Sequence, residues 1–550
     1  MASWARRLRT GGSKARRVEA AVHPELAALM AHWGERQHRV GSELEQRILV
    51  ERPRARYSTW YEMFPRSASP DPARPGTLRD VAARLPYVAG MGFDVLYLPP
   101  IHPIGAAHRK GRNGALIARP DDPGSPWAIG SSAGGHTSID PALGTLEDFD
   151  HLVAAARRHG VEIALDLAFQ CSPDHPWVRE HPQWFRHRAD GSIQHAENPP
   201  KKYEDIIPFD FESGDWTSLW QALYGVVEFW IERGVCIFRV DNPHTKPFAF
   251  WEWLIAQIRS REPDVLFLAE AFTRPKVMLR LAKLGFSQSY TYFAWRNEPA
   301  ALRAYFEELT SAPVVEFFRP NAWPNTPDIL TEYLQHGGRP ASVIRLILAG
   351  TLAASYGIYG PPFDLFESTP RHAGSEEYLD SEKYQQRVWD VEHASSLRPL
   401  ITRLNCIRRD NPALQQDRTL RFYAVDNPAL IAYSKTADAR PVGDASAERG
   451  AGTPFADDRA GPAEQAAGTN VIVCVVNTNP YATESGTVHL DLEALGIGDE
   501  PYQLHDLLSG ARYFRRGANL AVVLDPGVMP AHVLRVRRRV RSEHDFEYYL

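Results

Sequence analysis

Residues 236–247 read CIFRVDNPHTKP. A short apolar run leads to Asp241, and an asparagine, a proline and a histidine then interrupt it. Arg239 lies two residues before Asp241, so in a strand both side chains point to the same face. Burying an ionised carboxylate is costly unless a partner compensates its charge. The stretch therefore predicts a buried strand that ends on a carboxylate held beside a cation.

Seven similar runs lie along the chain, and amphipathic helical patterns separate them. The predicted strands are YSTWYEMFP from 57, DVLYLPP from 94, VEIALDLAF from 161, VCIFRVD from 235, VLFLAEAF from 265, SQSYTYFAW from 287, PVVEFF from 313 and SYGIYG from 355. Eight strand–helix units predict an α/β protein with a (β/α)8 TIM barrel over residues 56–400. A doubly wound open sheet is the alternative, but no Gly-rich phosphate fingerprint follows the first strand.

Two βα loops of this barrel are unusually long. They cover about 101–145 and 171–216, and both follow the carboxyl ends of predicted strands. Loops of such length in a compact domain usually carry function. Because TIM-barrel chemistry occurs at the carboxyl ends of the strands, these insertions are expected to surround the active site.

The sequence on either side of the barrel has a different character. We expect a disordered leader over 1–19 and a short helical N-terminal segment over 20–55. Over 401–550 the apolar residues alternate at period two between turn residues, which predicts a C-terminal antiparallel β-sandwich. Its strands are interrupted at about 437–468 by a segment rich in Ala, Gly, Pro and Asp, which is expected to be a disordered loop.

The composition excludes several kinds of partner. The 550 residues carry a formal net charge of -5, so no basic face is available for nucleic acid. The most apolar tract, LILAGTLAASYGI from 346, is too short to span a bilayer, so we expect no membrane partner. The four cysteines are far apart and the start of the chain lacks an apolar signal region, which favours reduced thiols and a cytoplasmic protein.

Two more carboxylates follow predicted strands as Asp241 does. Glu270 comes at the end of the fifth strand, and Asp328 lies in the loop after the seventh. In a closed barrel these positions converge on one mouth, where two carboxylates about 5–5.5 Å apart can perform retaining glycosyl transfer. Arg239 is expected to keep Asp241 ionised. Carboxylates at strand ends can instead cap helices, but three of them with an arginine favour a catalytic site.

The segments IALDLAFQCSPDH, IFRVDNPHTKP, LFLAEAFTRP and RPNAWPNTPDIL resemble the four conserved regions of the α-amylase superfamily, glycoside hydrolase family 13. Within it, QCSPDHPWV, ENPPKKYEDI, HRKGRN, VDNPHTKP, AEAFTRP and NTPD together resemble the α-1,4-glucan:maltose-1-phosphate maltosyltransferases. The resemblance covers about residues 50–550. Before the barrel this chain has only the helical stretch, whereas the resembling enzymes carry a further β-sandwich domain there.

The resemblance implies roles for individual residues. Asp241 would be the nucleophile, Glu270 the general acid/base and Asp328 the transition-state stabiliser, while Arg239 would orient the nucleophile. The positions matching the phosphate site are Asn198, Lys201, Tyr203 and Asn242, and those matching the maltosyl site are Lys110, Gln170, Lys383 and Tyr384. A loop with two lysines and a hydroxyl suits a phosphate leaving group, which needs cations and hydrogen-bond donors.

No metal or other cofactor is expected. The histidines of the second long loop, His175, His181, His187 and His195, do not have the usual spacing of zinc ligands. Gln170 and Cys171 stand where many amylases carry an asparagine that binds calcium, which argues against a calcium site.

The resemblance implies retaining transfer of maltosyl units from α-maltose 1-phosphate to the non-reducing end of α-1,4-glucans or maltooligosaccharides, with release of phosphate. It implies a double-displacement glycosyltransferase of α-glucan synthesis, with a homodimer as a further expectation. One alternative is an α-glucan hydrolase or transglycosylase that uses no phosphate. Another is a non-catalytic glucan-binding protein, which would be expected to lack at least one of the three carboxylates.

Overall fold

The computed structural model describes residues 2–10, 12–33, 48–198, 201–438 and 469–537. They form two units, residues 1–50 and 51–550, which are described separately. In the first unit the helices are α1 (Ala2–Thr10), α2 (Lys14–Ala21) and α3 (Pro24–Trp33). The sequence led us to expect a disordered leader over 1–19, and the structure has α1 and α2 there instead. These segments are rich in the helix formers Ala and Arg, and Ser13 caps α2 by accepting from Arg16 N.

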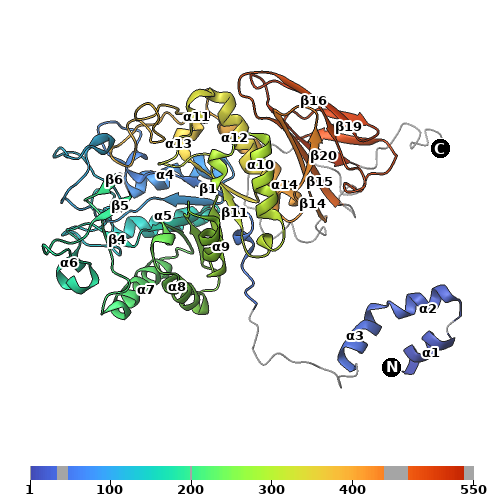
Figure 1. Cartoon of the computed structure of the whole chain (residues 1–550), viewed down its shortest axis with the longest axis horizontal. Helices are drawn as coiled ribbons and strands as arrows, with labels where there is room; N and C mark the ends of the chain where they lie inside the picture. The colour runs from blue at the N-terminus through green and yellow to red at the C-terminus, as the bar shows by residue number, and fades with distance from the viewer. Residues whose placement is uncertain (1, 11, 34–47, 199–200, 439–468, 538–550) are drawn as a thin grey trace. The chain divides into compact units, whose positions relative to one another are not determined.

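The second unit contains a closed barrel of eight parallel strands inside a ring of helices (Figure 1). Its strands are β1 (Ser58–Glu62), β2 (Val95–Leu98), β3 (Glu162–Leu167), β8 (Ile237–Val240), β9 (Leu266–Ala269), β10 (Gln288–Tyr290), β11 (Pro320–Ala322) and β12 (Ser355–Tyr359). The main helices that follow them are α4 (Leu78–Gly90), α5 (Leu146–Arg158), α7 (Trp216–Glu232), α8 (Phe248–Arg261), α9 (Pro275–Lys283), α10 (Pro299–Thr310), α12 (Gly338–Leu352) and α14 (Arg398–Asp410). The predicted TIM barrel is confirmed.

The seventh strand does not lie where the sequence predicted it. Val314–Glu316, inside the predicted run PVVEFF, forms a 3-10 turn after α10, and β11 begins at Pro320. β11 is placed by its neighbours: it pairs with both β10 and β12, and Asn321 Nδ2 donates to Gln288 Oε1 at 2.9 Å. Tertiary pairing has therefore overridden the local β-propensity of the valines and phenylalanines.

The interior of the barrel is filled by side chains from alternate strand positions. The lower positions are apolar and include Trp60, Ala164, Ile237, Leu268 and Trp323. Two residues further along β1, β3, β8 and β9, the same inward-facing positions are occupied by Glu62, Asp166, Arg239 and Glu270. The change from apolar to charged residues marks the carboxyl end of the barrel, where TIM-barrel enzymes carry their active sites.

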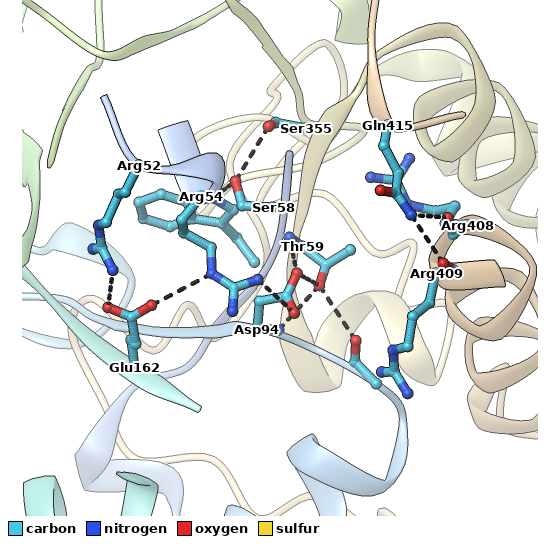
Figure 2. A network of polar contacts seen from close by, with 12 residues as sticks. Arg52, Arg54, Ser58, Thr59, Asp94, Glu162, Ser355, Arg408, Arg409 and Gln415 are labelled. Carbon is cyan, nitrogen blue, oxygen red and sulfur yellow. Dashed lines mark hydrogen bonds and ion pairs between the residues drawn. The ribbon is translucent and has the colours of Figure 1, made fainter. Parts of the chain in front are cut away.

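Ion pairs close the opposite, amino-terminal end of the strands (Figure 2). Arg54 Nη1 lies 2.7 Å from Asp94 Oδ1, just before β2, and Arg52 Nη1 lies 2.7 Å from Glu162 Oε2 at the start of β3. Asp94 Oδ2 also accepts from Thr59 N of β1 at 3.0 Å. Three neighbouring strands are thereby joined through two carboxylates, which indicates a stabilising role for this end.

The predicted insertions hold short elements above the carboxyl ends of the strands. In the first, 101–145, lies the short 3-10 turn Arg112–Gly114. The second, 171–216, contains or adjoins β4 (Gln170–Cys171), α6 (Pro176–Glu180), β5 (Ala196–Asn198), β6 (Lys201–Tyr203) and β7 (Ile207–Pro208). β4 pairs with β7, and β5 pairs with β6 as a hairpin. Two further short helices, α11 (Glu332–His336) and α13 (Gly360–Asp364), follow β11 and β12.

The C-terminal domain is antiparallel, as predicted. Its strands are β13 (Arg421–Val425), β14 (Leu430–Asp438), β15 (Thr469–Asn477), β16 (Glu484–His489), β17 (Tyr502–Asp506), β18 (Arg512–Arg515), β19 (Asn519–Leu524) and β20 (Ala531–Arg537). They form one sheet in the order β18-β17-β20-β15-β14-β13-β16-β19 around its own apolar core. The segment predicted as a disordered loop, 437–468, falls on residues outside those described, except for the end of β14.

No described helix has the length and apolar composition needed to cross a membrane.

Candidate active site

Asp241 immediately follows β8 and is 6% exposed. Two side chains hold its carboxylate: Arg239 Nη1 donates to Oδ1 at 3.0 Å, and Gln170 Nε2 donates to Oδ2 at 3.2 Å. Its backbone N–H donates to the carbonyl of Leu167 at the end of β3. The carboxylate is therefore fixed from two neighbouring strands, as a preorganised nucleophile requires.

Glu270 immediately follows β9 and faces the same point. Arg239 Nη2 lies 2.6 Å from its Oε1, and the backbone N–H of Asn242 donates to its Oε2 at 3.3 Å. Asn242 has φ 40° and ψ 57°, a left-handed conformation that asparagine tolerates better than most residues. Asp241 and Glu270 also share a direct hydrogen bond. The two carboxyl groups are thus neighbours held by one guanidinium.

The two carboxyls differ in protonation. Burial raises the pKa of Glu270 to about 8, and the charge of Asp241 adds to this against the opposing effect of Arg239. Burial acts in the same direction on Asp241, but there the cations Arg239 and Lys246 outweigh it and its pKa lies below the ordinary value. At neutral pH Glu270 therefore holds a proton while Asp241 is ionised, which is the pairing of acid and nucleophile that glycosyl transfer needs.

Two further buried carboxyls line the same end of the barrel and were not singled out from the sequence. Asp166 Oδ2 accepts from Arg239 at 2.9 Å, from Tyr97 at 2.6 Å and from Trp127 at 3.2 Å. Burial raises the pKa of Asp166 to about 6 and that of Glu62 well above its ordinary range. The inward period-two positions at the ends of β1 and β3 are the signal that could have identified them.

Asp328 lies after β11, as predicted, and is the most exposed of the three expected catalytic carboxylates. Lys383 Nζ contacts its Oδ1 at 2.5 Å. The Lys383 ammonium also lies 5.2 Å from the ring centroid of Trp127 and 5.8 Å from that of Tyr384. Lys383 and Tyr384 therefore lie beside Asp328, where a sugar could contact both the cation and the rings.

The remaining predicted residues lie in the two insertions. Lys110 is buried. Its positive charge acts on Asp205, whose pKa is raised by burial and lowered in part by Lys110. Asn198 and Lys201 face each other in the register of the β5–β6 hairpin, where Tyr203 pairs with Ala196. Gln170 and Asn242 are already part of the Asp241 and Glu270 contacts.

His175 of the second insertion belongs to a buried pair of histidines next to Gln170. His175 Nε2 lies 3.2 Å from His136 Nδ1, and His136 Nε2 lies 3.0 Å from the carbonyl of Gln170. Burial lowers the pKa of His136 to about 4 and that of His175 to about 2, so both rings are neutral. They support the backbone of the residue that donates to Asp241. Within the described ranges, no group of three or more His, Cys, Asp or Glu is arranged to hold a metal ion.

Comparison with known families agrees with this architecture. A model described as "Alpha amylase, catalytic domain" matches residues 62–222, and one described as "GLGE, C-terminal" matches residues 422–536. The first match covers β1 to α7 of the barrel, and the second covers most of the C-terminal sheet.

Several curated relatives align with nearly the whole chain. The α-1,4-glucan:maltose-1-phosphate maltosyltransferase of Methylacidiphilum infernorum (isolate V4) is 51% identical over 94% of this chain and 74% of its own length. The enzyme of the same name from Mycolicibacterium smegmatis is 48% identical over 96% of this chain and 72% of its own length.

Solved structures of similar fold include α-amylases. The α-amylase from Lactobacillus plantarum is 19% identical with a TM-score of 0.59, covering 88% of this chain and 100% of that one. The maltogenic α-amylase AmyB from Thermotoga neapolitana is 17% identical with a TM-score of 0.61, covering 88% and 99%. At this level of identity the likeness concerns the fold.

Proposed function

The chain belongs to the family of α-1,4-glucan:maltose-1-phosphate maltosyltransferases, and from this membership we propose that it transfers maltosyl units from α-maltose 1-phosphate to the non-reducing end of α-1,4-glucans, releasing phosphate. The observation that carries the proposal is the pair Asp241 and Glu270, joined by Arg239 and held in opposite protonation states. A non-catalytic glucan-binding protein would have no use for a protonated carboxyl in contact with an ionised one.

The proposed reaction begins with the Asp241 carboxylate attacking the anomeric carbon of the donor. The bond from that carbon to the phosphate oxygen breaks as Glu270 transfers its proton to the leaving phosphate. Asp241 then carries a β-linked maltosyl group. Because one guanidinium, that of Arg239, binds both carboxyls, they lie close together, as expected for a retaining enzyme.

In the second step the 4-hydroxyl of an acceptor glucan attacks the same carbon from the opposite side. Glu270, now ionised, accepts the hydroxyl proton, and Asp241 leaves as a carboxylate. Two inversions give net retention, and both carboxyls return to their starting protonation states. Arg239 stabilises Asp241 each time it is released as an anion.

We propose substrate contacts for the other predicted residues. We assign Asp328, with Lys383 and Tyr384, to the hydroxyls and ring of the maltosyl unit, and Lys110 and Gln170 to the same unit. Asn198, Lys201, Tyr203 and Asn242 are assigned to the phosphate. The support is their match to the family's motifs together with the Lys383–Asp328 and Gln170–Asp241 contacts.

We also propose a cytoplasmic location and a homodimer. The support for the location is that all four cysteines are free, as is usual for the reducing cytosol. The homodimer rests on the resemblance to the family, and light scattering of the purified chain tests it.

The experiment for the function uses the whole chain with α-maltose 1-phosphate and a maltooligosaccharide acceptor. We expect the acceptor to be lengthened by steps of two glucosyl units, with one phosphate released for each maltosyl unit transferred. Phosphate release matched by free maltose would indicate a hydrolase instead. Elongation of a glucan without any maltose 1-phosphate would indicate a transglycosylase, and either result would overturn the proposal.

A further inference from the structure

Lys246 is a buried cation directly behind the nucleophile. It is 8% exposed and follows the 3-10 turn Pro243–Thr245. Its Nζ donates to the carbonyl oxygen of Asp241 at 3.1 Å and to that of Asn242 at 3.3 Å. Lys246 thus closes the turn that follows β8 by binding the backbone of the nucleophile and of the next residue.

This turn needs to be held. Asn242 is left-handed, and in this conformation its N–H donates to Glu270. A non-glycine residue in this region is maintained by its surroundings. The two carbonyls that Lys246 binds lie on either side of the Asn242 backbone N–H and Cα, so the lysine fixes the peptide that links both catalytic carboxyls.

The charges of the site also require a second cation. Arg239 contacts three carboxyls at once, with distances of 2.9 Å to Asp166, 3.0 Å to Asp241 and 2.6 Å to Glu270. One positive charge cannot balance both Asp166 and Asp241 when they are ionised. Within the described ranges no carboxylate oxygen lies within 4.0 Å of Lys246 Nζ, so its charge is not committed to a single ion pair.

We propose that Lys246 is a positioning residue for the maltosyl transfer: its ammonium group holds the Asp241–Asn242 turn and supplies the second positive charge that keeps the nucleophile ionised. This inference rests on the proposed function, because the reaction must be measurable for the role to be tested. Lys246 touches neither donor nor acceptor in this account, and it acts through Asp241 and Glu270.

Several charged groups face Lys246 and set its effect. These groups are Asp166 of β3, Arg239 of β8, Asp241 and Glu270 directly after β8 and β9, and His244 in the turn before Lys246. Burial lowers the pKa of Lys246, and the three carboxyls oppose that effect. In return, the ammonium favours the ionised forms of Asp241 and Glu270, so removing it should raise the pKa of both.

The pH dependence of kcat/KM should report the loss of the Lys246 charge. The acidic limb of kcat/KM against pH reports ionisation of Asp241, and the basic limb reports loss of the proton from Glu270. Without the Lys246 charge both limbs should move to higher pH, by about one unit or more. A residue that merely supports the fold would lower the whole profile without moving either limb.

The experiment compares four variants of the whole chain with α-maltose 1-phosphate, whose phosphate needs the Glu270 proton to leave, and a maltooligosaccharide acceptor. Lys246→Met removes the charge and both hydrogen bonds, Lys246→Gln keeps a donor without charge, and Lys246→Arg keeps the charge. Lys435→Met is the matched control, because Lys435 is another fully buried lysine, paired with Asp417 in the C-terminal domain at 3.0 Å. Thermal unfolding of each variant is measured alongside the rates.

We expect both limbs to shift upward in Lys246→Met and Lys246→Gln. We also expect kcat/KM at neutral pH to fall about tenfold or more in Lys246→Met, because the Asp241–Asn242 turn loses both of its hydrogen bonds and the nucleophile is less well positioned. Lys246→Arg should restore the limbs, and Lys435→Met should lower the thermal midpoint without moving them. Unshifted limbs in a folded Met or Gln variant overturn the proposal. So does failure of both to fold, since Lys246 would then be a structural residue. Failure of the proposed function would appear separately, as a wild-type chain with no transfer activity.

Discussion

At the residue scale, the chemistry depends on how two neighbouring carboxyls are kept different. Asp241 and Glu270 are both buried and both contact Arg239. Asp241 accepts a hydrogen bond from the side-chain amide of Gln170, and its backbone carbonyl binds Lys246. Glu270 accepts from the backbone N–H of Asn242 and contacts Arg239. The donors around Asp241 stabilise its ionised form, whereas at Glu270 burial has the larger effect and favours the protonated form.

The use of phosphate should depend on Lys201. A cationic donor to a phosphate dianion contributes on the order of 1.5–3 kcal/mol, so Lys201→Ala should lower kcat/KM for α-maltose 1-phosphate by roughly ten- to a hundredfold. α-Maltosyl fluoride has a small leaving group and should lose far less. Lys202→Ala, at the exposed neighbouring residue of β6, is the control and should affect neither donor.

An equal loss with both donors would mean that Lys201 supports the sugar or the fold rather than the phosphate. If Lys202→Ala lowered kcat/KM as much as Lys201→Ala, the specific assignment of Lys201 to the phosphate would be contradicted.

The site residues that the sequence revealed share a simple feature. Asp241, Glu270 and Arg239 lie at strand ends with clear apolar runs before them, so their convergence follows from the barrel topology alone. Lys246 could not be assigned in this way. A lysine in a proline-flanked turn is usually exposed, and its burial against backbone carbonyls depends on how the turn folds.

At the scale of elements, seven of the eight barrel strands fall within the runs predicted from apolar and β-branched residues. The exception is β11, because its Pro–Asn–Ala sequence has little β-propensity and is placed by pairing with β10 and β12. Asp328 nevertheless lies in the loop after this strand, as predicted, since the error moved the strand without changing the order of the elements.

Close packing next to β11 gives a prediction about Gly357 of β12. A Cβ there would lie 2.2 Å from a ring carbon of Trp323, which is fully buried and stacks on Tyr290 with ring centroids 4.9 Å apart. Gly357→Ala should therefore destabilise the protein by about 1–3 kcal/mol through overpacking. Denaturant unfolding measures the change.

Gly90→Ala is the matched control. Gly90 ends α4, and a Cβ added there meets nothing within 4 Å. It should leave stability unchanged or raise it slightly, because alanine favours helix over glycine. If Gly357→Ala were as stable as Gly90→Ala, the tight contact between β12 and Trp323 would be refuted.

At the scale of the whole molecule, buried tyrosine contacts join the first and last parts of the barrel. Asp364 of α13 accepts from Tyr61 of β1 at 2.6 Å and from Tyr87 of α4 at 2.9 Å. Burial raises the pKa of Asp364 to about 7, so the folded chain holds this proton up to neutral pH. The contact therefore links closure of the barrel to pH.

The sign follows from proton binding. Between about pH 4 and 7 the folded state keeps the Asp364 proton while the unfolded chain loses it, so this group's contribution to stability falls as pH rises, by about 1.4 kcal/mol per pH unit. Asp364→Asn should remove that slope. The free energy of unfolding of both proteins, measured across this range, gives the difference, with Asp525→Asn at an exposed turn as control. Parallel curves for wild type and Asp364→Asn would show that Asp364 is ionised in the folded chain.

The proposed mechanism requires that Asp241 carries the maltosyl unit between donor and acceptor. Glu270→Ala should let that intermediate accumulate with α-maltosyl fluoride, because fluoride needs little protonation to leave while the second step lacks its base. Mass spectrometry of the intact variant and of its peptides measures the adduct directly. The account predicts one maltosyl group per chain, attached to the peptide that contains Asp241 and absent from the Asp241→Ala, Glu270→Ala double variant. No adduct, or an adduct on another residue, would contradict it.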